Sequence, residues 1–196
     1  KMITRIISGI IAAAIIVILL LLPPFALALT VFAASSAGLY ELYKALKNKS
    51  INIDVPVSLI AAAIITGRVY VISLTPHLIP GSNVFLQKIS TPESMGFLLF
   101  ILMLYLFCRV IFSGAGFKPE DMAYTLFGIA YIPFLMSFAI MIRNLDRGFE
   151  YIWLILIGSV ITDVFAYFTG VTVGKHKIIP HISPKKTVGG SLGGAA

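Results

Sequence analysis

Six apolar segments, each long enough to cross a bilayer as a helix, dominate the sequence. Polar connectors separate them, and they cover residues 5–22, 24–40, 56–74, 96–112, 122–142 and 151–170. A transmembrane helix needs about 20 predominantly apolar residues. Hydrophobic residues make up 59% of the chain and charged residues only 12%, whereas a soluble domain averages about 25% charged residues. We therefore expect an all-α, polytopic membrane protein with about six transmembrane helices.

The first apolar segment has some features of a secretory signal peptide. Basic residues precede it, and Ala26-Leu27-Ala28 offers a cleavage-like sequence. The apolar core of a signal peptide is normally about 7–15 residues long, but here apolar sequence continues to residue 39. We therefore predict two transmembrane helices that meet at a turn formed by Pro23-Pro24.

The first polar segment, residues 41–54, carries Lys44, Lys47 and Lys49. Its tyrosines and leucines share one side of a helix that could lie along the membrane interface. One interpretation is that the lysines meet anionic lipid headgroups. The other, which we favour, is that they only anchor the chain on the cytoplasmic side of the membrane.

The distribution of basic residues predicts the orientation of the chain. With a cytoplasmic N-terminus, eleven of the 15 lysines and arginines lie on the inner side, three lie on the outer side, and Arg68 lies inside a span. This bias agrees with the positive-inside rule. We expect a multi-pass protein of the cell (inner) membrane with both ends in the cytoplasm. A nucleic-acid partner is excluded because there is no aqueous domain large enough to carry a basic face.

A basic, glycine-rich segment follows the sixth span. Residues 170–194 contain four lysines, two histidines and six glycines but no acidic residue. Asp163 lies just before them, inside an apolar run. Glycine allows backbone N–H groups to approach a phosphate closely, and lysine supplies the balancing charge. We therefore divide the chain into a transmembrane body, residues 1–170, and a cytoplasmic nucleotide-binding segment, residues 171–196.

Within this segment, Ser183-Pro184 resembles a helix N-cap with proline at the first helical position. Lys185 and Lys186 would then lie in a first helical turn, where positive charge opposes the helix dipole unless an anion binds there. The alternative is that these lysines only follow the positive-inside rule. The serine and glycines, together with Asp163, favour a phosphate site.

A charged residue inside a membrane is costly and usually faces a partner or a cavity. For Asp163, an ion pair with Arg68 is one alternative, and binding of a metal or substrate is the interpretation that we prefer. His176 and His181 have no third metal ligand near them in the sequence, so we do not predict a zinc site.

The pattern of roughly the last thirty residues resembles the phosphatidate cytidylyltransferase (CDP-diglyceride synthetase) family of polytopic membrane enzymes. The matching residues are Asp163, Ala166-Tyr167, Gly174-Lys-His-Lys177, Pro180, Ser183-Pro-Lys-Lys-Thr187, Gly190 and Gly193-Gly194. The chain departs from the family at Gly189, where an acidic residue is usual. The family also continues into further helices with a histidine–glycine–glycine segment and an Asp-Arg-x-x-Asp-like pair, which lie beyond Ala196.

The resemblance implies an enzyme that joins CTP and phosphatidic acid in the lipid bilayer, with Mg²⁺, to give CDP-diacylglycerol and pyrophosphate. It implies catalytic roles for Lys185, Lys186 and Asp163, with Asp163 as a magnesium ligand. The residues implied for the CTP phosphates are Lys175, Lys177, Ser183, Lys185, Lys186, Thr187, Gly190, Gly193 and Gly194. A homodimer is one open arrangement. We expect sequence beyond Ala196 to supply the remaining metal ligands, so that residues 1–196 alone would not release pyrophosphate.

Two other functions remain open at this stage. A CTP-dependent, dolichol-kinase-like enzyme would share the basic motif but would release CDP. A transporter or channel would use Arg68 and Asp163 to mark a path, and it would show repeated broken helices at the midplane, for which only Pro133 gives a hint.

Overall fold

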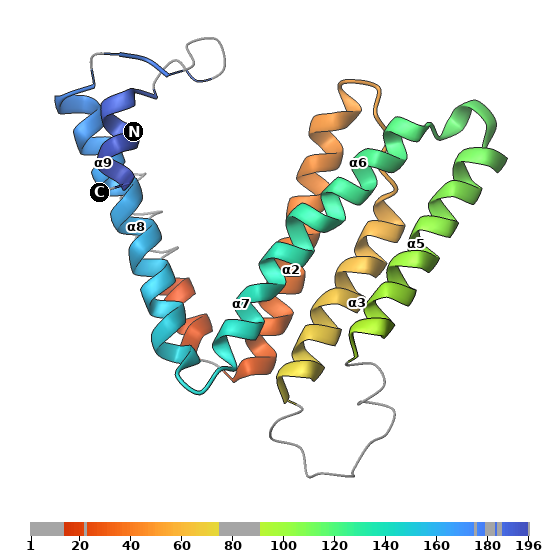
Figure 1. Cartoon of the computed structure of the whole chain (residues 1–196), viewed down its shortest axis with the longest axis horizontal. Helices are drawn as coiled ribbons and strands as arrows, with labels where there is room; N and C mark the ends of the chain where they lie inside the picture. Colours follow the sequence, from red (N-terminus) through yellow and green to blue (C-terminus); the bar gives the residue numbers. More distant parts are fainter. Residues whose placement is uncertain are drawn as a thin grey trace. The chain divides into compact units, whose positions relative to one another are not determined.

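The structure is a computed structural model, and it describes residues 14–21, 23–74, 91–174, 176–178, 183 and 186–195. The described residues are overwhelmingly helical (Figure 1), and the single β-bridge among them pairs Lys177 with Thr187. The predicted all-α fold is therefore confirmed.

Five long apolar helices form the transmembrane part of the described chain. They are α2 (Pro24–Lys47), α3 (Val55–Leu74), α5 (Pro92–Phe112), α8 (Gly148–Thr172) and a composite helix of α6 (Pro119–Ile129), η3 (Ala130–Phe134) and α7 (Leu135–Arg143). They confirm five of the six predicted spans. The sixth, residues 5–22, lies mostly outside the described residues, although residues 14–21 are helical.

Proline sets the start of several of these helices, because its fixed φ suits the first turn and its missing N–H costs nothing there. Pro23 is the N-cap of α2, as the predicted break at Pro23-Pro24 requires. Thr91 caps α5, and its side chain accepts a hydrogen bond from the Ser94 N–H. Pro133 has a different effect, because it lies in the π-helical turn η3 that interrupts the α6–α7 span.

The polar segment 41–54 corrects one expectation. Instead of a separate helix along the interface, α2 continues without a break to Lys47. Lys44 and Lys47 lie in its last turns, where their positive charge complements the helix dipole. Their ammonium groups lie over the rings of Tyr40, at 4.5 Å, and Tyr43, at 5.6 Å.

The chain divides into two compact units, residues 1–146 and residues 147–196. In the first unit, α2, α3 and α7 pack against one another, and α5 packs on α6. Gly128 of α6 lets Leu42 of α2 approach closely, since a Cβ at Gly128 would lie 2.9 Å from the Leu42 side chain. In the second unit, α8 packs against α9 (Val188–Ala195). The predicted division after Gly170, between a transmembrane body and a nucleotide-binding segment, stays a prediction.

Candidate functional site

One face of α8 forms a wall of the pocket in the second unit. The residues on it are Asp163, Ala166, Tyr167, Gly170 and Val171, which recur with the three- and four-residue spacing of a single helix face. The other lining residues come from the basic segment and from α9: Ser183, Lys186, Thr187, Gly190 and Ser191. The pocket has a volume of about 650 Å³. Residues from the end of an apolar span and from the basic segment therefore meet around one space.

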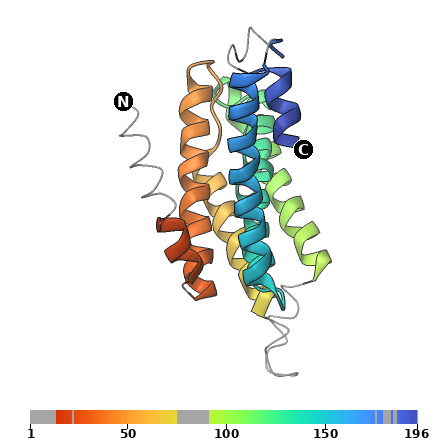
Figure 2. The ribbon, with the colours of Figure 1, turned by 90° about the vertical axis from the view of Figure 1, so that its left-hand side faces the viewer.

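Backbone hydrogen bonds between segments 176–178 and 186–188 bring the basic segment back to the C-terminal end of α8. The Ile178 N–H donates to the Lys186 carbonyl at 3.1 Å, and the Val188 N–H donates to the His176 carbonyl at 2.9 Å. The Lys186 N–H closes a turn by donating to the Ser183 carbonyl at 3.2 Å. These bonds place Lys186 and Thr187 immediately before α9, which lies alongside the C-terminal part of α8 (Figures 1 and 2).

The start of α9 corrects a second expectation. The helix begins at Val188 rather than at Pro184, and its cap is Thr187, whose hydroxyl oxygen accepts a hydrogen bond from the Gly190 N–H at 3.2 Å. Threonine is a good N-cap residue. Lys186 therefore precedes the helix instead of lying within its first turn.

Small residues let α8 and α9 approach closely. On α8 these are Thr162, Ala166 and Gly170, which follow one another at four-residue intervals. A Cβ at Gly190 would lie 2.8 Å from the Ala166 carbonyl oxygen, and one at Gly194 would lie 3.0 Å from the Ala166 Cβ. A Cβ at Gly193 would overlap the Thr169 side chain. Stripes of small residues commonly join helices in membranes.

Five of the residues implied for the site line the pocket together: Asp163, Ser183, Lys186, Thr187 and Gly190. Gly193 and Gly194 pack against α8, so close helix packing accounts for them, and their contact with phosphate stays a prediction. Lys177 is exposed and pairs through its backbone with Thr187. Lys175, Lys185 and His181 lie outside the described residues.

The charge in this unit is strongly unbalanced. After Asp163 the sequence holds four lysines and no further acid. The Asp163 side chain is exposed at the pocket, as is Lys186. Among the residues that the structure describes, no three His, Cys, Asp or Glu side chains form a group that could hold a metal by themselves. The pocket therefore suits an anion beside a single carboxylate.

A second polar cluster, in the first unit, contains Asp54 and Asp121, neither of which the sequence analysis singled out. Both are buried, with 2% of each residue exposed. Asp54 forms an ion pair with Arg109 and accepts a hydrogen bond from the Tyr105 hydroxyl at 3.3 Å. The signal for Asp54 was its position directly before Val55-Pro56, since aspartate before a proline-led helix is a typical cap.

The fold and the pocket together define a class: a polytopic membrane protein in which a span leads into a lysine-bearing pocket. The profile of the Cytidylyltransferase family matches residues 3–196. The chain therefore belongs to this family.

Curated relatives named phosphatidate cytidylyltransferase are similar to the chain. The one from Bacillus subtilis (strain 168) is 29% identical over 191 residues, which cover 97% of this chain and 66% of the relative. The one from Staphylococcus saprophyticus is 37% identical over 95 residues, 48% of this chain and 34% of the relative. The one from Mycobacterium bovis is 34% identical over 74 residues, 38% of this chain and 24% of the relative.

The chain thus spans just under two thirds of the Bacillus protein, and smaller shares of the other two are matched. No solved structure shows a significant match to it.

Proposed function

We propose that the chain forms the membrane body and the nucleotide-phosphate pocket of a phosphatidate cytidylyltransferase. In this reaction CTP and phosphatidic acid give CDP-diacylglycerol and pyrophosphate. The observation that carries the proposal is the pocket in which Asp163, Lys186 and the first turn of α9 meet. The names of the relatives point to the same reaction.

In the proposed reaction, a phosphate oxygen of phosphatidic acid attacks the α-phosphorus of CTP. A new P–O bond forms, the bond between the α-phosphorus and its bridging oxygen breaks, and pyrophosphate leaves with the electron pair. Phosphoryl chemistry of this kind depends mainly on positioning and on electrostatic stabilisation of the oxygens. The protein needs to supply charge and hydrogen-bond donors rather than a nucleophile.

Lys186 and Thr187 are suited to that task. The Lys186 ammonium is exposed at the pocket and can balance the charge of a triphosphate. The Thr187 hydroxyl uses one acceptor position for the α9 cap, and its proton remains free to donate to a phosphate oxygen. The N-terminus of α9 adds backbone N–H groups and the positive end of a helix dipole.

Asp163 fits a magnesium site as one ligand. Mg²⁺ commonly binds one or two carboxylates together with substrate phosphate oxygens, and Asp163 is the acidic residue that lines this pocket. When bound, the ion would neutralise charge that builds up on the phosphate oxygens. Asp163 would hold it on the face of α8 that lines the pocket.

We also propose that the pocket faces the cytoplasm of a cell whose inner membrane holds the protein. Support comes from the bias of basic residues toward one side. CTP is a soluble nucleotide, so a site at that surface can receive it from water while the lipid substrate arrives from the bilayer.

The test is Lys186→Ala, with Lys49→Ala as a control that removes one exposed lysine from the first unit. A charge-assisted hydrogen bond contributes about 1.5–3 kcal/mol, so kcat/KM for CTP should fall roughly 10- to 100-fold. The assay follows pyrophosphate and CDP-diacylglycerol in membranes that contain these variants in a complete phosphatidate cytidylyltransferase, because residues 1–196 alone are not expected to release pyrophosphate. Unchanged kinetics in Lys186→Ala would contradict the assignment of the pocket, and release of CDP in place of pyrophosphate would indicate a lipid kinase.

A further inference from the structure

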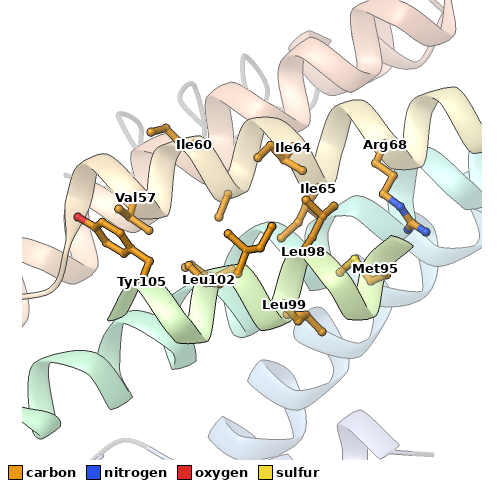
Figure 3. Close-up of a pocket in the computed structure, with 13 residues that line it drawn as sticks. Val57, Ile60, Ile64, Ile65, Arg68, Met95, Leu98, Leu99, Leu102 and Tyr105 are labelled. Atoms are coloured by element: carbon orange, nitrogen blue, oxygen red, sulfur yellow. The ribbon is translucent and has the colours of Figure 1, made fainter. Parts of the chain in front are cut away.

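An apolar groove runs between α3 and α5 in the first unit, and it shares no lining residue with the pocket of the second unit. Side chains from the two helices face each other across it, among them Val57 and Ile64 of α3 and Leu98 and Leu102 of α5 (Figure 3). Its volume is about 230 Å³. Ile64 is 43% exposed, so the groove is open at the surface of the unit.

The groove has the length of one leaflet. From residue 57 to residue 68 it extends about 16 Å at a helical rise of about 1.5 Å per residue, and half of a hydrocarbon core of about 30 Å is similar. Arg68 closes the far end, where its guanidinium donates to the Thr91 carbonyl at 2.7 Å and to the Ser94 hydroxyl at 3.3 Å. A second helix, about 10 Å across, would need a far larger groove.

The other end of the groove is polar. Tyr105 lines the groove and donates its hydroxyl to Asp54, the carboxylate that pairs with Arg109. Asp54 and Arg109 also line an adjoining hollow of about 380 Å³, together with Tyr40 and Tyr43.

Two further lysines belong to this polar end. The exposed Lys44 and Lys47 lie over the rings of Tyr40 and Tyr43, two of the residues that line the hollow. The Asp54 charge is already paired with Arg109, so it does not offset the positive charge of these lysines.

We propose that this groove binds an anionic phospholipid, with an acyl chain between α3 and α5 and the phosphate beside Lys44 and Lys47. The apolar side chains that line the groove suit a hydrocarbon acyl chain, and the positive charge of the lysines suits the negative phosphate of the headgroup. The inference does not rest on the proposed cytidylyltransferase reaction, because it concerns lipid retention by the first unit and not nucleotide chemistry.

The experiment uses the whole chain, extracted from bilayers that contain phosphatidylglycerol and phosphatidylcholine and analysed by native mass spectrometry. The wild-type chain should retain phosphatidylglycerol in preference to phosphatidylcholine. Leu102→Trp, which fills the groove, should lower this retention about tenfold. Leu104→Trp, on the same helix but outside the groove, should not lower it. Ile64→Trp blocks the groove from α3 and repeats the test if Leu102→Trp does not fold.

The proposed contact between the lipid headgroup and the two lysines is tested separately. The double variant Lys44→Gln/Lys47→Gln should lose most of its preference for phosphatidylglycerol, by roughly fivefold per lysine. Lys49→Gln/Lys118→Gln carries the same change of net charge outside the cation–π pairs and should keep the preference. Equal loss in Leu102→Trp and Leu104→Trp would overturn the proposal, as would undiminished retention in both groove variants or a cross-linked second copy in the groove.

Discussion

The Asp121 carboxylate accepts hydrogen bonds from two backbone N–H groups, those of Asn52 at 2.7 Å and Lys118 at 2.8 Å. The first belongs to the connector between α2 and α3, and the second precedes α6. Thr125 continues the contact, because its hydroxyl oxygen accepts from the Asp54 N–H at 3.0 Å. A few buried polar groups therefore join two connectors that lie far apart in the sequence.

Asp121→Asn should destabilise the first unit. The amide keeps one acceptor oxygen but directs an N–H₂ group at a backbone donor, so one buried N–H loses its partner at a cost of about 1–3 kcal/mol. Glu120→Gln changes the neighbouring, exposed acid and is the control. Thermal unfolding in detergent should give a lower Tm for Asp121→Asn alone. Equal Tm values would mean that the Asp121 contacts do not stabilise the unit.

At the scale of elements, the contact between α8 and α9 depends on which glycine faces the partner helix. Gly190 is buried against the α8 backbone, whereas a Cβ at the adjacent Gly189 would meet its nearest atoms at an ordinary 3.4 Å. Replacing each of these two glycines by alanine therefore distinguishes the effect of close helix packing on stability from the effect of helix propensity.

Gly190→Ala should force the two helices apart and cost about 1–3 kcal/mol, with a matching loss of CTP turnover because Gly190 also lines the pocket. Gly189→Ala should be neutral or stabilising by up to about 1 kcal/mol, since alanine favours helix. Unfolding curves and turnover of the two variants give the comparison. A Gly190→Ala variant as stable as Gly189→Ala would show that the close contact is not required.

At the scale of the whole molecule, contacts within the first unit agree with the topology predicted from charge. Asn52 and Asp121 join the two connectors that were both assigned to the inner side. At the other end, the Asn144 side chain donates to the Ser73 hydroxyl at 2.7 Å, which joins the ends of two spans assigned to the outer side.

Cysteine labelling in the membrane should place the connectors on the same inner and outer sides as the charge-based prediction. In a Cys108→Ser background, Leu46→Cys and Ile182→Cys should react with an impermeant thiol reagent only after the membrane is opened. Leu145→Cys, at the exposed turn between α7 and α8, should react from outside. Labelling of positions 46 and 182 from outside would reverse the proposed orientation.

The sequence by itself determined the class of the protein and most of its helices. Runs of apolar residues specify transmembrane helices without reference to partners, because a bilayer leaves the backbone few alternatives. Pro24 marked the start of α2, as predicted, whereas α5 begins at Pro92, four residues before the predicted start at residue 96. The family motif in residues 163–194 also came from the order of residues alone.

Only the tertiary structure decided how the small and polar residues are used. A threonine can cap a helix or bind a ligand, and a glycine can serve a phosphate or a helix contact, so their local sequence leaves both uses open. The pairing of segment 176–178 with segment 186–188 made Thr187 the cap of α9. The buried Asp54 carboxylate is paired with Arg109 and the Tyr105 hydroxyl, and the Asp121 carboxylate accepts from the Asn52 N–H, so these partners lie more than fifty positions away in the sequence. Such long-range partners satisfy buried charge, and no local pattern in a sequence encodes them.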